Sequence, residues 1–327
     1  MAAKIEKISD LKRCPGALRG SVLAVGNFDG AHRGHRAVLE RALAIAAEQN
    51  CPAMVLTFEP HPRQFFRADA PLFRVTSAAL KQQLLGQLGF DGVVELAFNK
   101  EFASLTADEF VARVLVEGLG IRHVVTGVDF HFGKNRQGGP AFLMASGEKH
   151  GFGVTLVDSF RDEGAEIVSS SRIRELLAAG ELAEANALLG YRYTVEGEVV
   201  AGRQLGRTLG FPTANMVLPE SNGLKHGVYA VRLRRADGSL HDGVASFGRR
   251  PTVEADGAPL LETFVFDFSG DLYGETCRVS FFGRLRGEEK FDSLEALNAQ
   301  MQRDEAEARA LLSGVKPLSE LDRAVSF

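Results

Sequence analysis

The sequence predicts a Rossmann-like α/β domain with a parallel sheet, followed by an all-β, Greek-key-like barrel with a C-terminal helix. Short apolar runs alternate with helical patterns in the first half, as in a parallel sheet covered by helices. Beyond about residue 189 the chain consists of short strands with Gly and Pro turns, which favours a barrel. The 327 residues exceed the roughly 250–300 at which a single core stops growing, so we expect two domains, at 1–188 and 189–327.

The first half contains five apolar runs of strand length, at residues 21–25, 53–58, 93–98, 123–127 and 154–157. Between these runs, helical patterns cover residues 35–49 and 77–88. Thr106 and Glu109 have the spacing of a capping box, so a helix is expected from there to about residue 117. A short helix is expected at 173–179, where a preceding serine can cap it.

The second half contains five expected strands, at residues 194–200, 228–234, 240–247, 260–268 and 276–282. Asp237-Gly238 lies between two of them and is a hairpin signal. A terminal helix is expected to begin near Ser293. Its expected buried side consists of Leu294, Leu297, Met301, Ala308 and Leu311.

Composition limits the classes of partner. The net charge is -4 and the pI is about 6.1, which argues against broad nucleic-acid binding. The three cysteines are far apart and have no metal-ligand or redox spacing, which suits a reducing compartment such as the cytoplasm. The N-terminus lacks an apolar signal region, and no run reaches the roughly 18 apolar residues of a membrane span. The sequence leaves open a weak homo-oligomer.

A first candidate site follows the first expected strand, where ligands of open parallel sheets bind. His32 and His35 lie on either side of Gly34. Gly34 has no side chain and so leaves room for a phosphate to approach the backbone. A cation in the first turn of a helix opposes the helix dipole, so His35 there favours a docked anion. Paired imidazoles could stabilise an α-phosphate as pyrophosphate leaves. The alternatives are a surface pair without a role and a zinc site, which would lack a closed ligand set.

The segment at 169–174 (SSSRIR) can form a phosphate clasp from hydroxyls, backbone N–H groups and arginine. The alternative is a plain helix cap with solvated arginines. A loop from Gly127 to Asn135 resembles a P-loop, but it has one residue too many between the glycines and lacks the final Ser or Thr. Any kinase activity must therefore use another phosphate cradle.

These segments together resemble a known family. GNFDGAHRGH, TFEPHP, GVDFHFG and SSSRIR stand in the order and approximate spacing of bifunctional riboflavin kinase/FAD synthetases, whose N-terminal module is similar to other HxGH nucleotidylyltransferases. The resemblance implies an FMN adenylyltransferase domain at 1–188 and a riboflavin kinase domain at 189–327. Two departures are visible: Ser171 replaces a Thr, and His131 replaces an expected Arg.

The resemblance also implies roles for individual residues of the first domain. His32 and His35 would contact ATP phosphates, and Ser170, Ser171 and Arg174 would hold the β,γ end. The remaining implied residues are Gly26, Phe28 and Gly34 for ATP, and His61 and Asp129 for the FMN and nucleotide pocket.

A second candidate site lies in the segment GRTLGFPTAN. Thr213 and Asn215 are two residues apart, so on extended chain they face the same side. A hydroxyl and an amide oxygen suit Mg²⁺, which shares phosphate oxygens. Backbone N–H groups near Gly206, Arg207 and Gly210 can reach a phosphate. The alternative is an ordinary Gly-Pro turn, which the full match to the family's GRxLGFPTAN disfavours.

A candidate base lies in the expected strand 260–268. Alternation places Leu260, Glu262, Phe264, Phe266 and Phe268 on one face, where Glu262 is the only ionisable group and could accept a hydroxyl proton. The alternative is a solvated strand end. LETFVFDF followed by DLYGE resembles the family's kinase segment, whose Glu activates the ribityl 5′-hydroxyl. Within the matching LRGEEKFDSLEAL stretch, Arg286 is expected to bind flavin, whereas Ala201-Gly202-Arg203 departs from the family's HGD-like segment.

The leading hypothesis is an enzyme with two sites. The barrel would phosphorylate riboflavin to FMN, and the sheet domain would adenylylate FMN to FAD with release of pyrophosphate. ATP is the co-substrate and Mg²⁺ the metal of both steps. One alternative is a single-activity HxGH nucleotidylyltransferase with a non-catalytic flavin-binding barrel. Another is a flavin-responsive regulatory protein without chemistry.

Overall fold

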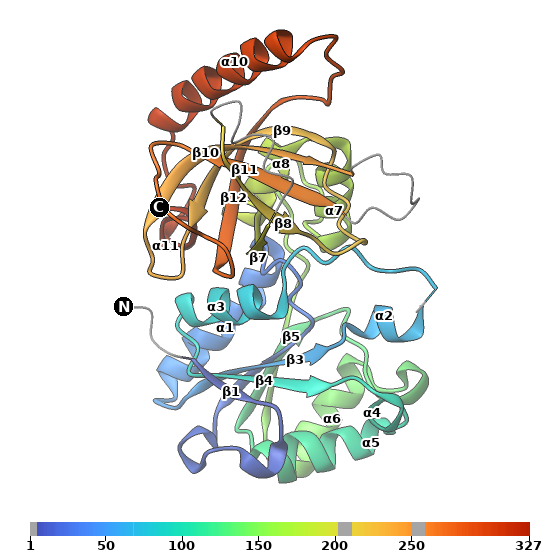
Figure 1. Ribbon diagram of the computed structural model, residues 1–327. Helices are drawn as coiled ribbons and strands as arrows, with labels where there is room; N and C mark the ends of the chain where they lie inside the picture. Colours follow the sequence, from blue (N-terminus) through green and yellow to red (C-terminus); the bar gives the residue numbers. More distant parts are fainter. Residues whose placement is uncertain (1–4, 68, 202–210, 250–258) are drawn as a thin grey trace. The chain divides into compact units, whose positions relative to one another are not determined.

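The computed structural model describes residues 5–67, 69–201, 211–249 and 259–327 (Figure 1). By internal contacts the chain divides into two compact units, residues 1–72 with 78–169, and residues 73–77 with 170–327. This division lies before the expected domain boundary at 188/189. The reason is that α7 (Ser170–Ala179) packs on α8 (Leu182–Leu189), and α8 packs on strand β12 (Thr276–Arg286) of the second unit.

The first unit is built on a six-stranded sheet whose strand pairs are all parallel, which confirms the predicted α/β class. The order is β1-β4-β3-β2-β5-β6. The chain therefore steps outward from β2 in one direction and then restarts on its other side at β5, so β2 and β5 flank a topological switch point. The strands are β1 (Glu6–Ile8), β2 (Val22–Val25), β3 (Ala53–Glu59), β4 (Gly92–Ala97), β5 (His123–Gly127) and β6 (Gly153–Val157).

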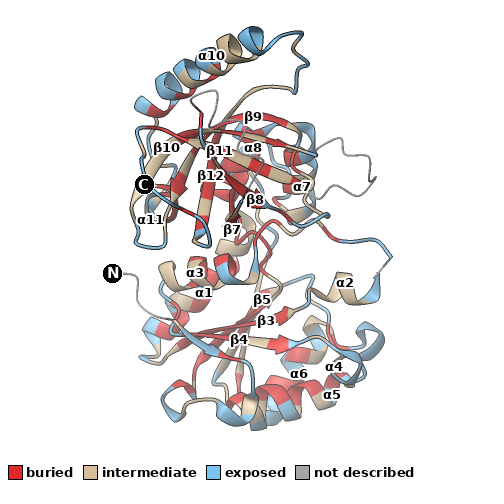
Figure 2. Ribbon diagram, viewed as in Figure 1, coloured by how far each residue is buried: buried red, intermediate tan, exposed pale blue. Residues whose placement is uncertain are grey.

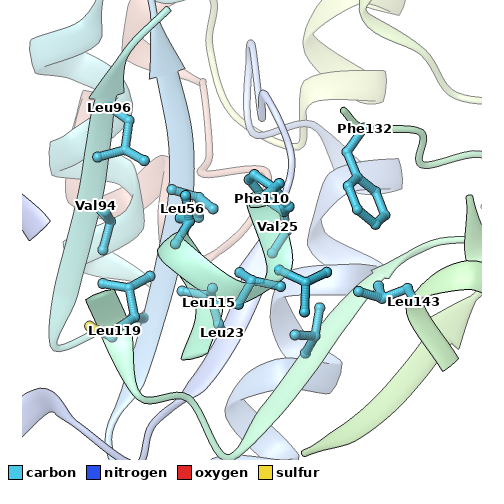
Figure 3. Close-up of a cluster of buried hydrophobic side chains, with 14 of the residues drawn as sticks. Leu23, Val25, Leu56, Val94, Leu96, Phe110, Leu115, Leu119, Phe132 and Leu143 are labelled. Atoms are coloured by element: carbon cyan, nitrogen blue, oxygen red, sulfur yellow. The ribbon is translucent and has the colours of Figure 1, made fainter. Parts of the chain in front are cut away.

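Helices cover both faces of this sheet. Along β2, Leu23 and Val25 enter one core cluster, whereas Val22 and Ala24 enter the other, as alternation requires. Figure 3 shows the first cluster, in which Phe110 and Leu115 lie against the strands. The helices are α1 (Arg33–Glu48), α2 (Pro62–Phe66), α3 (Ala78–Gln87), α4 (Lys100–Ala103), α5 (Ala107–Glu109), η3 (Phe110–Leu119) and α6 (Pro140–His150), with the short turns η1 (Leu11–Arg13), η2 (Gly16–Leu18) and η4 (Lys134–Arg136).

The predicted capping box is confirmed. The Thr106 hydroxyl accepts the backbone N–H of Glu109, and the Glu109 carboxylate accepts that of Thr106. The hydrogen bonds continue through η3 with π-type spacing and end at Gly120, whose φ is 55°.

The second unit contains a closed barrel of six antiparallel strands in the order β10-β11-β8-β7-β12-β9, which confirms the predicted all-β class. Strand β8, which begins at Thr213, was not expected. Strand β11 ends at Val265, before the expected residue 268. The strands are β7 (Thr194–Val200), β8 (Thr213–Val217), β9 (Gly227–Arg234), β10 (Leu240–Gly248), β11 (Leu260–Val265) and β12.

The terminal helix α10 (Leu294–Ser313) is capped by Ser293 as expected, but its predicted buried side is partly wrong. Leu294 is 65% exposed and Leu311 36%, whereas Ala308 and Leu312 are buried against the barrel, and so is Asp304. Figure 2 shows the largely exposed helix. A second helix, α11 (Glu320–Ser326), follows it. Among the described helices, we find none with the length and apolar character of a membrane span.

Candidate active sites

The loop between β2 and α1 has an unusual backbone. Phe28 and Ala31 have φ angles of 49° and 38°, in the left-handed region that non-glycine residues rarely occupy, and Gly30 between them has φ of 88°. Phe28, Asp29 and His32 are nevertheless buried. Such conformations persist only where their surroundings hold them, and they are concentrated at functional sites.

The two histidines of the HxGH segment lie together at the start of α1. His32 caps the helix, because its Nδ1 accepts the backbone N–H of His35 at 3.2 Å. The two rings stack with centroids 3.6 Å apart and planes 19° from parallel, and the Phe28 ring meets His35 edge-on at 5.4 Å. Since Nδ1 of His32 is an acceptor, the proton of its neutral ring lies on Nε2.

Gly34 is required by close packing at this helix start. A Cβ atom there would lie 2.7 Å from the carbonyl oxygen of Val168, and one at Gly26 would lie 2.9 Å from the Phe28 ring. The missing side chain at Gly34, which was expected to leave room for a phosphate, therefore also leaves room for the backbone of Val168. The neighbouring Arg33 is paired with Glu163 at 2.5 Å and lies over the Phe160 ring.

His61 and Asp129 follow β3 and β5 at the same edge of the sheet, since the strands are parallel. His61 caps α2 through its Nδ1, which accepts the backbone N–H of Arg63 at 3.1 Å. The Asp129 carboxylate is so close to Gly127 that a Cβ there would lie 2.8 Å from it. His131, which replaces the Arg of the family pattern, is bonded through Nδ1 to the backbone oxygen of Asp129 at 2.8 Å.

Ser170, Ser171 and Arg174 lie on α7, which belongs to the second unit, whereas His32 and His35 belong to the first. Within the second unit, Arg174 donates from Nε to the backbone oxygen of Phe73 at 2.6 Å. The grouping of these residues into one phosphate site with the histidines remains a prediction.

The barrel brings three of the predicted kinase residues onto one face. Glu262 pairs directly with Asn215 across β11 and β8, and Thr213 pairs with Phe264. Cross-strand partners share a face, so Thr213, Asn215 and Glu262 point to the same side. Phe264 lies on the same face, and its ring contacts the Phe211 ring with centroids 4.9 Å apart.

The side-chain oxygen of Asn215, Oδ1, is buried and has no hydrogen-bond partner among the described residues. The residue is 4% exposed, and its Nδ2 donates to the backbone oxygen of Thr213 at 3.2 Å. Since buried acceptors are almost always satisfied, Oδ1 fits a ligand position for a hard cation such as Mg²⁺.

The same face continues around the barrel as a row of paired residues. Glu262 pairs with Ser246, Ser246 with Val228, and Val228 with Arg286. Arg286 is held there by a two-point ion pair with Asp304 of α10. The row therefore ends at the residue for which flavin binding was predicted. Gly206, Arg207 and Gly210, with the departure at 202–203, lie outside the described residues.

Several buried charged residues were missed by sequence reasoning, among them Lys81, Asp304 and the ion pair of Arg192 with Asp322. Lys81 is 1% exposed and Asp304 4% exposed. A signal for Lys81 existed, because it shares a helical stripe with Leu84 and Leu85. Across residues 5–67, 69–201, 211–249 and 259–327 we find no cluster of three His, Cys, Asp or Glu side chains suited to a metal.

Matches to two family models show that the chain is a two-module transferase of nucleotidyl and phosphoryl groups. The FAD synthetase family model matches residues 14–172, and the riboflavin kinase model matches residues 189–312. The chain belongs to the family of bifunctional riboflavin kinase/FMN adenylyltransferases.

Curated relatives agree with this assignment, and a solved structure shares the fold. The chain is 44% identical to the bifunctional riboflavin kinase/FMN adenylyltransferase of Pseudomonas fluorescens over 90% of its length and 93% of the relative. It is 40% identical to that of Escherichia coli K12, over 96% of its length and 99% of the relative. A crystal structure from Streptococcus pneumoniae, described as a macrolide-efflux protein, is similar with a TM-score of 0.80 and 32% identity, over 93% of this chain and 98% of that one.

Proposed function

We propose that this chain converts riboflavin to FMN at the barrel and FMN to FAD at the sheet domain, with ATP as co-substrate of both reactions. The match of both family models to separate halves of the chain is the observation that carries this proposal. We further propose that each reaction uses its own residues, and that the residues predicted from the sequence perform it.

In the kinase reaction, Glu262 accepts the proton of the ribityl 5′-hydroxyl. The resulting oxygen attacks the γ-phosphorus of ATP, the bond to the β,γ-bridging oxygen breaks, and ADP leaves. The pairing of Glu262 with Asn215 supports a shared site for the base and the phosphate. Asn215 Oδ1 and the Thr213 hydroxyl would hold Mg²⁺, which supplies charge neutralisation at the phosphate oxygens when bound.

The row from Glu262 to Arg286 supports a position for riboflavin. These residues are three strand spacings apart, roughly 14 Å around the barrel at about 4.8 Å per strand. Ser246 and Val228 between them are small. A flavin whose ribityl end meets Glu262 could therefore extend across β10 and β9 toward Arg286.

In the adenylyl transfer, a phosphate oxygen of FMN attacks the α-phosphorus of ATP and pyrophosphate leaves. His32 and His35 donate hydrogen bonds to the α-phosphate as its charge rises. The Nε2 proton assigned to His32 supports this role. Gly26, Phe28 and Gly34 belong to the ATP loop, His61 and Asp129 line the pocket, and Ser170, Ser171 and Arg174 hold the β- and γ-phosphates.

Two further assignments remain predictions. Mg²⁺ is proposed for both reactions, because each transfers a group from a polyphosphate. A cytoplasmic location is proposed because Cys14, Cys51 and Cys277 are free thiols, which suits a reducing compartment.

A time course of all flavin species tests the proposal. With riboflavin and MgATP, FMN should appear first and FAD should follow. A single-activity nucleotidylyltransferase that acts on another phosphorylated alcohol would give no flavin product, and a flavin-binding regulator would return its bound flavin unchanged. Either of these results would overturn the proposed pair of activities.

A further inference from the structure

Lys81 is a fully buried lysine in the sheet domain. It lies on α3 and is 1% exposed, and its helix neighbours Leu80, Leu84 and Leu85 are also buried. A buried ammonium is rare unless it is well compensated by hydrogen bonds or charges. A position among leucines would ordinarily be filled by another apolar side chain, so the lysine needs a specific explanation.

Three hydrogen bonds join the Lys81 ammonium, the Thr57 hydroxyl and the Asn27 backbone oxygen at the end of the sheet. Lys81 Nζ donates to the Thr57 hydroxyl at 2.7 Å and to the backbone oxygen of Asn27 at 3.4 Å. The Thr57 hydroxyl itself donates to the same Asn27 oxygen at 3.1 Å. Three elements thereby meet at one point: helix α3, strand β3 and the loop that follows β2.

The bonded oxygen belongs to the residue just before the left-handed segment of that loop. Phe28 follows Asn27 directly with φ of 49°, and Ala31 follows with φ of 38°. Neither conformation is favoured by its residue type, so the loop needs an external restraint. The segment ends at His32, which caps α1 and stacks on His35. A shift at Asn27 would therefore move the histidine pair.

We propose that Lys81 is a positioning residue of the adenylyltransferase site. Together with Thr57 it fixes the Asn27 carbonyl, and through it the loop that sets His32 and His35 for the α-phosphate. This inference rests on the proposed role of the histidines in adenylyl transfer. It assigns Lys81 no contact with substrate.

Thr57 offers a matched pair of variants. T57V removes the hydroxyl and keeps the volume, whereas T57S keeps the hydroxyl and removes a methyl group. If the hydrogen bonds position the loop, T57V should lower kcat for FMN adenylylation by ~10–100-fold, in the range of a small active-site misplacement. T57S should retain at least tenfold more activity than T57V. A packing role predicts the reverse order and would overturn the proposal.

K81M tests the ammonium directly, with K149M on the exposed last turn of α6 as the control lysine. K81M should lower kcat for FMN adenylylation by ~10–100-fold with a smaller change in KM for ATP. Riboflavin phosphorylation in the same chain should stay at the wild-type rate and reports on the barrel, and thermal unfolding reports on the sheet domain. Wild-type kcat in a folded K81M would refute the positioning role. Unchanged adenylylation in H32A would instead refute the proposed function of the histidines.

Discussion

Arg286 and Asp304 form a two-point ion pair between the last barrel strand and the terminal helix. Arg286 Nε lies 2.9 Å from Asp304 Oδ1, and Nη2 lies 2.7 Å from Oδ2. Gln300, one turn earlier on α10, donates to Oδ1 at 2.8 Å. The side chains are 17% and 5% exposed, and the hydrogen bonds raise the pKa of Arg286 above its usual value. The pair fixes the end of the row that begins at Glu262.

Replacing Asp304 by Ala should destabilise the barrel unit and weaken FMN formation. Removing one partner of a buried ion pair costs about 3–5 kcal/mol, and the partial exposure of Arg286 places the loss toward the lower end. Denaturant unfolding and a riboflavin kinase assay measure the two effects.

The double variant R286M/D304L separates stability from binding. An apolar pair of similar volume should recover most of the unfolding free energy. If Arg286 contacts flavin, the KM for riboflavin should remain raised in the double variant. Full recovery of both the KM for riboflavin and the stability would show that Arg286 only links β12 to α10 and does not contact flavin.

Glu262→Gln should reduce FMN formation by ~10²–10⁴-fold, because the amide cannot accept the hydroxyl proton. FMN supplied directly should still become FAD at the wild-type rate, since the sheet domain has its own residues. High-performance chromatography of flavins from both substrates measures this. Equal loss of both activities would contradict two independent sites.

His32→Ala should have the opposite selectivity. It removes a phosphate donor, with a loss of adenylylation of roughly 10²–10³-fold, while riboflavin phosphorylation continues. It also removes the cap of α1, at a cost of about 1 kcal/mol. His32→Asn is the matched control, since Asn is a good cap but has no imidazole. The asparagine variant should regain the stability without regaining the activity.

Asn215→Leu should abolish riboflavin phosphorylation without destabilising the fold. Its Oδ1 is a buried acceptor whose burial costs about 1–3 kcal/mol when no partner is present. Exchanging it for an apolar side chain of similar size should leave the unfolding midpoint in metal-free buffer unchanged or higher. A clear fall in that midpoint would mean that the amide is structural. Mn²⁺ binding at the barrel, measured by electron paramagnetic resonance as the difference between the wild-type chain and this variant, should be lost, whereas Mn²⁺ binding at the sheet domain should remain.

His123 should make the sheet domain sensitive to acid. Burial, together with the charge of Arg41, lowers the pKa of this imidazole, whose Nε2 lies 2.8 Å from the Thr155 hydroxyl. The unfolded chain therefore binds a proton more readily than the folded one, so stability is present above about pH 6.5 and is lost as the pH falls below it. His123→Gln should flatten the fall in melting temperature between pH 7.5 and 5.5. His150→Gln, on the exposed end of α6, should leave the slope as it was.

Much of the architecture could be predicted from the sequence because the long apolar runs are the buried strands. The misses have physical reasons. Strand β1 has only three residues and two of them are charged, and the helix α6 begins with Pro140 behind a glycine pair. Thr213 and Asn215 were expected on extended chain, but the five residues of β8 are too short a run to be predicted as a strand of their own.

The candidate site residues likewise divide into those that the sequence predicts and those that only the structure identifies. Short motifs such as HRGH and PTAN contain residue types whose chemistry indicates a binding or catalytic role directly from the sequence. Lys81 and Asp304 bind partners far away in the chain, so their partners cannot be derived from the local sequence, although the apolar stripe on α3 predicts that the position of Lys81 is buried. A charged residue on a helix is ordinarily expected to face solvent, and only the fold brings Thr57 or Arg286 to it.

The placement of α7 limits how the chain can be cut. This helix carries Ser170, Ser171 and Arg174, yet its residues Ile173 and Leu177 are fully buried in the barrel unit, and the Leu177 carbonyl accepts the backbone N–H of Lys225. A fragment ending at residue 188 would keep the motif and nearly all of α8, but it would remove β12, on which α8 packs, and the hydrogen bond from Lys225 to Leu177. A fragment ending at 169 would lose the motif altogether. A separately folding sheet fragment that is to keep Ser170, Ser171 and Arg174 would therefore need another surface against which α7 can pack.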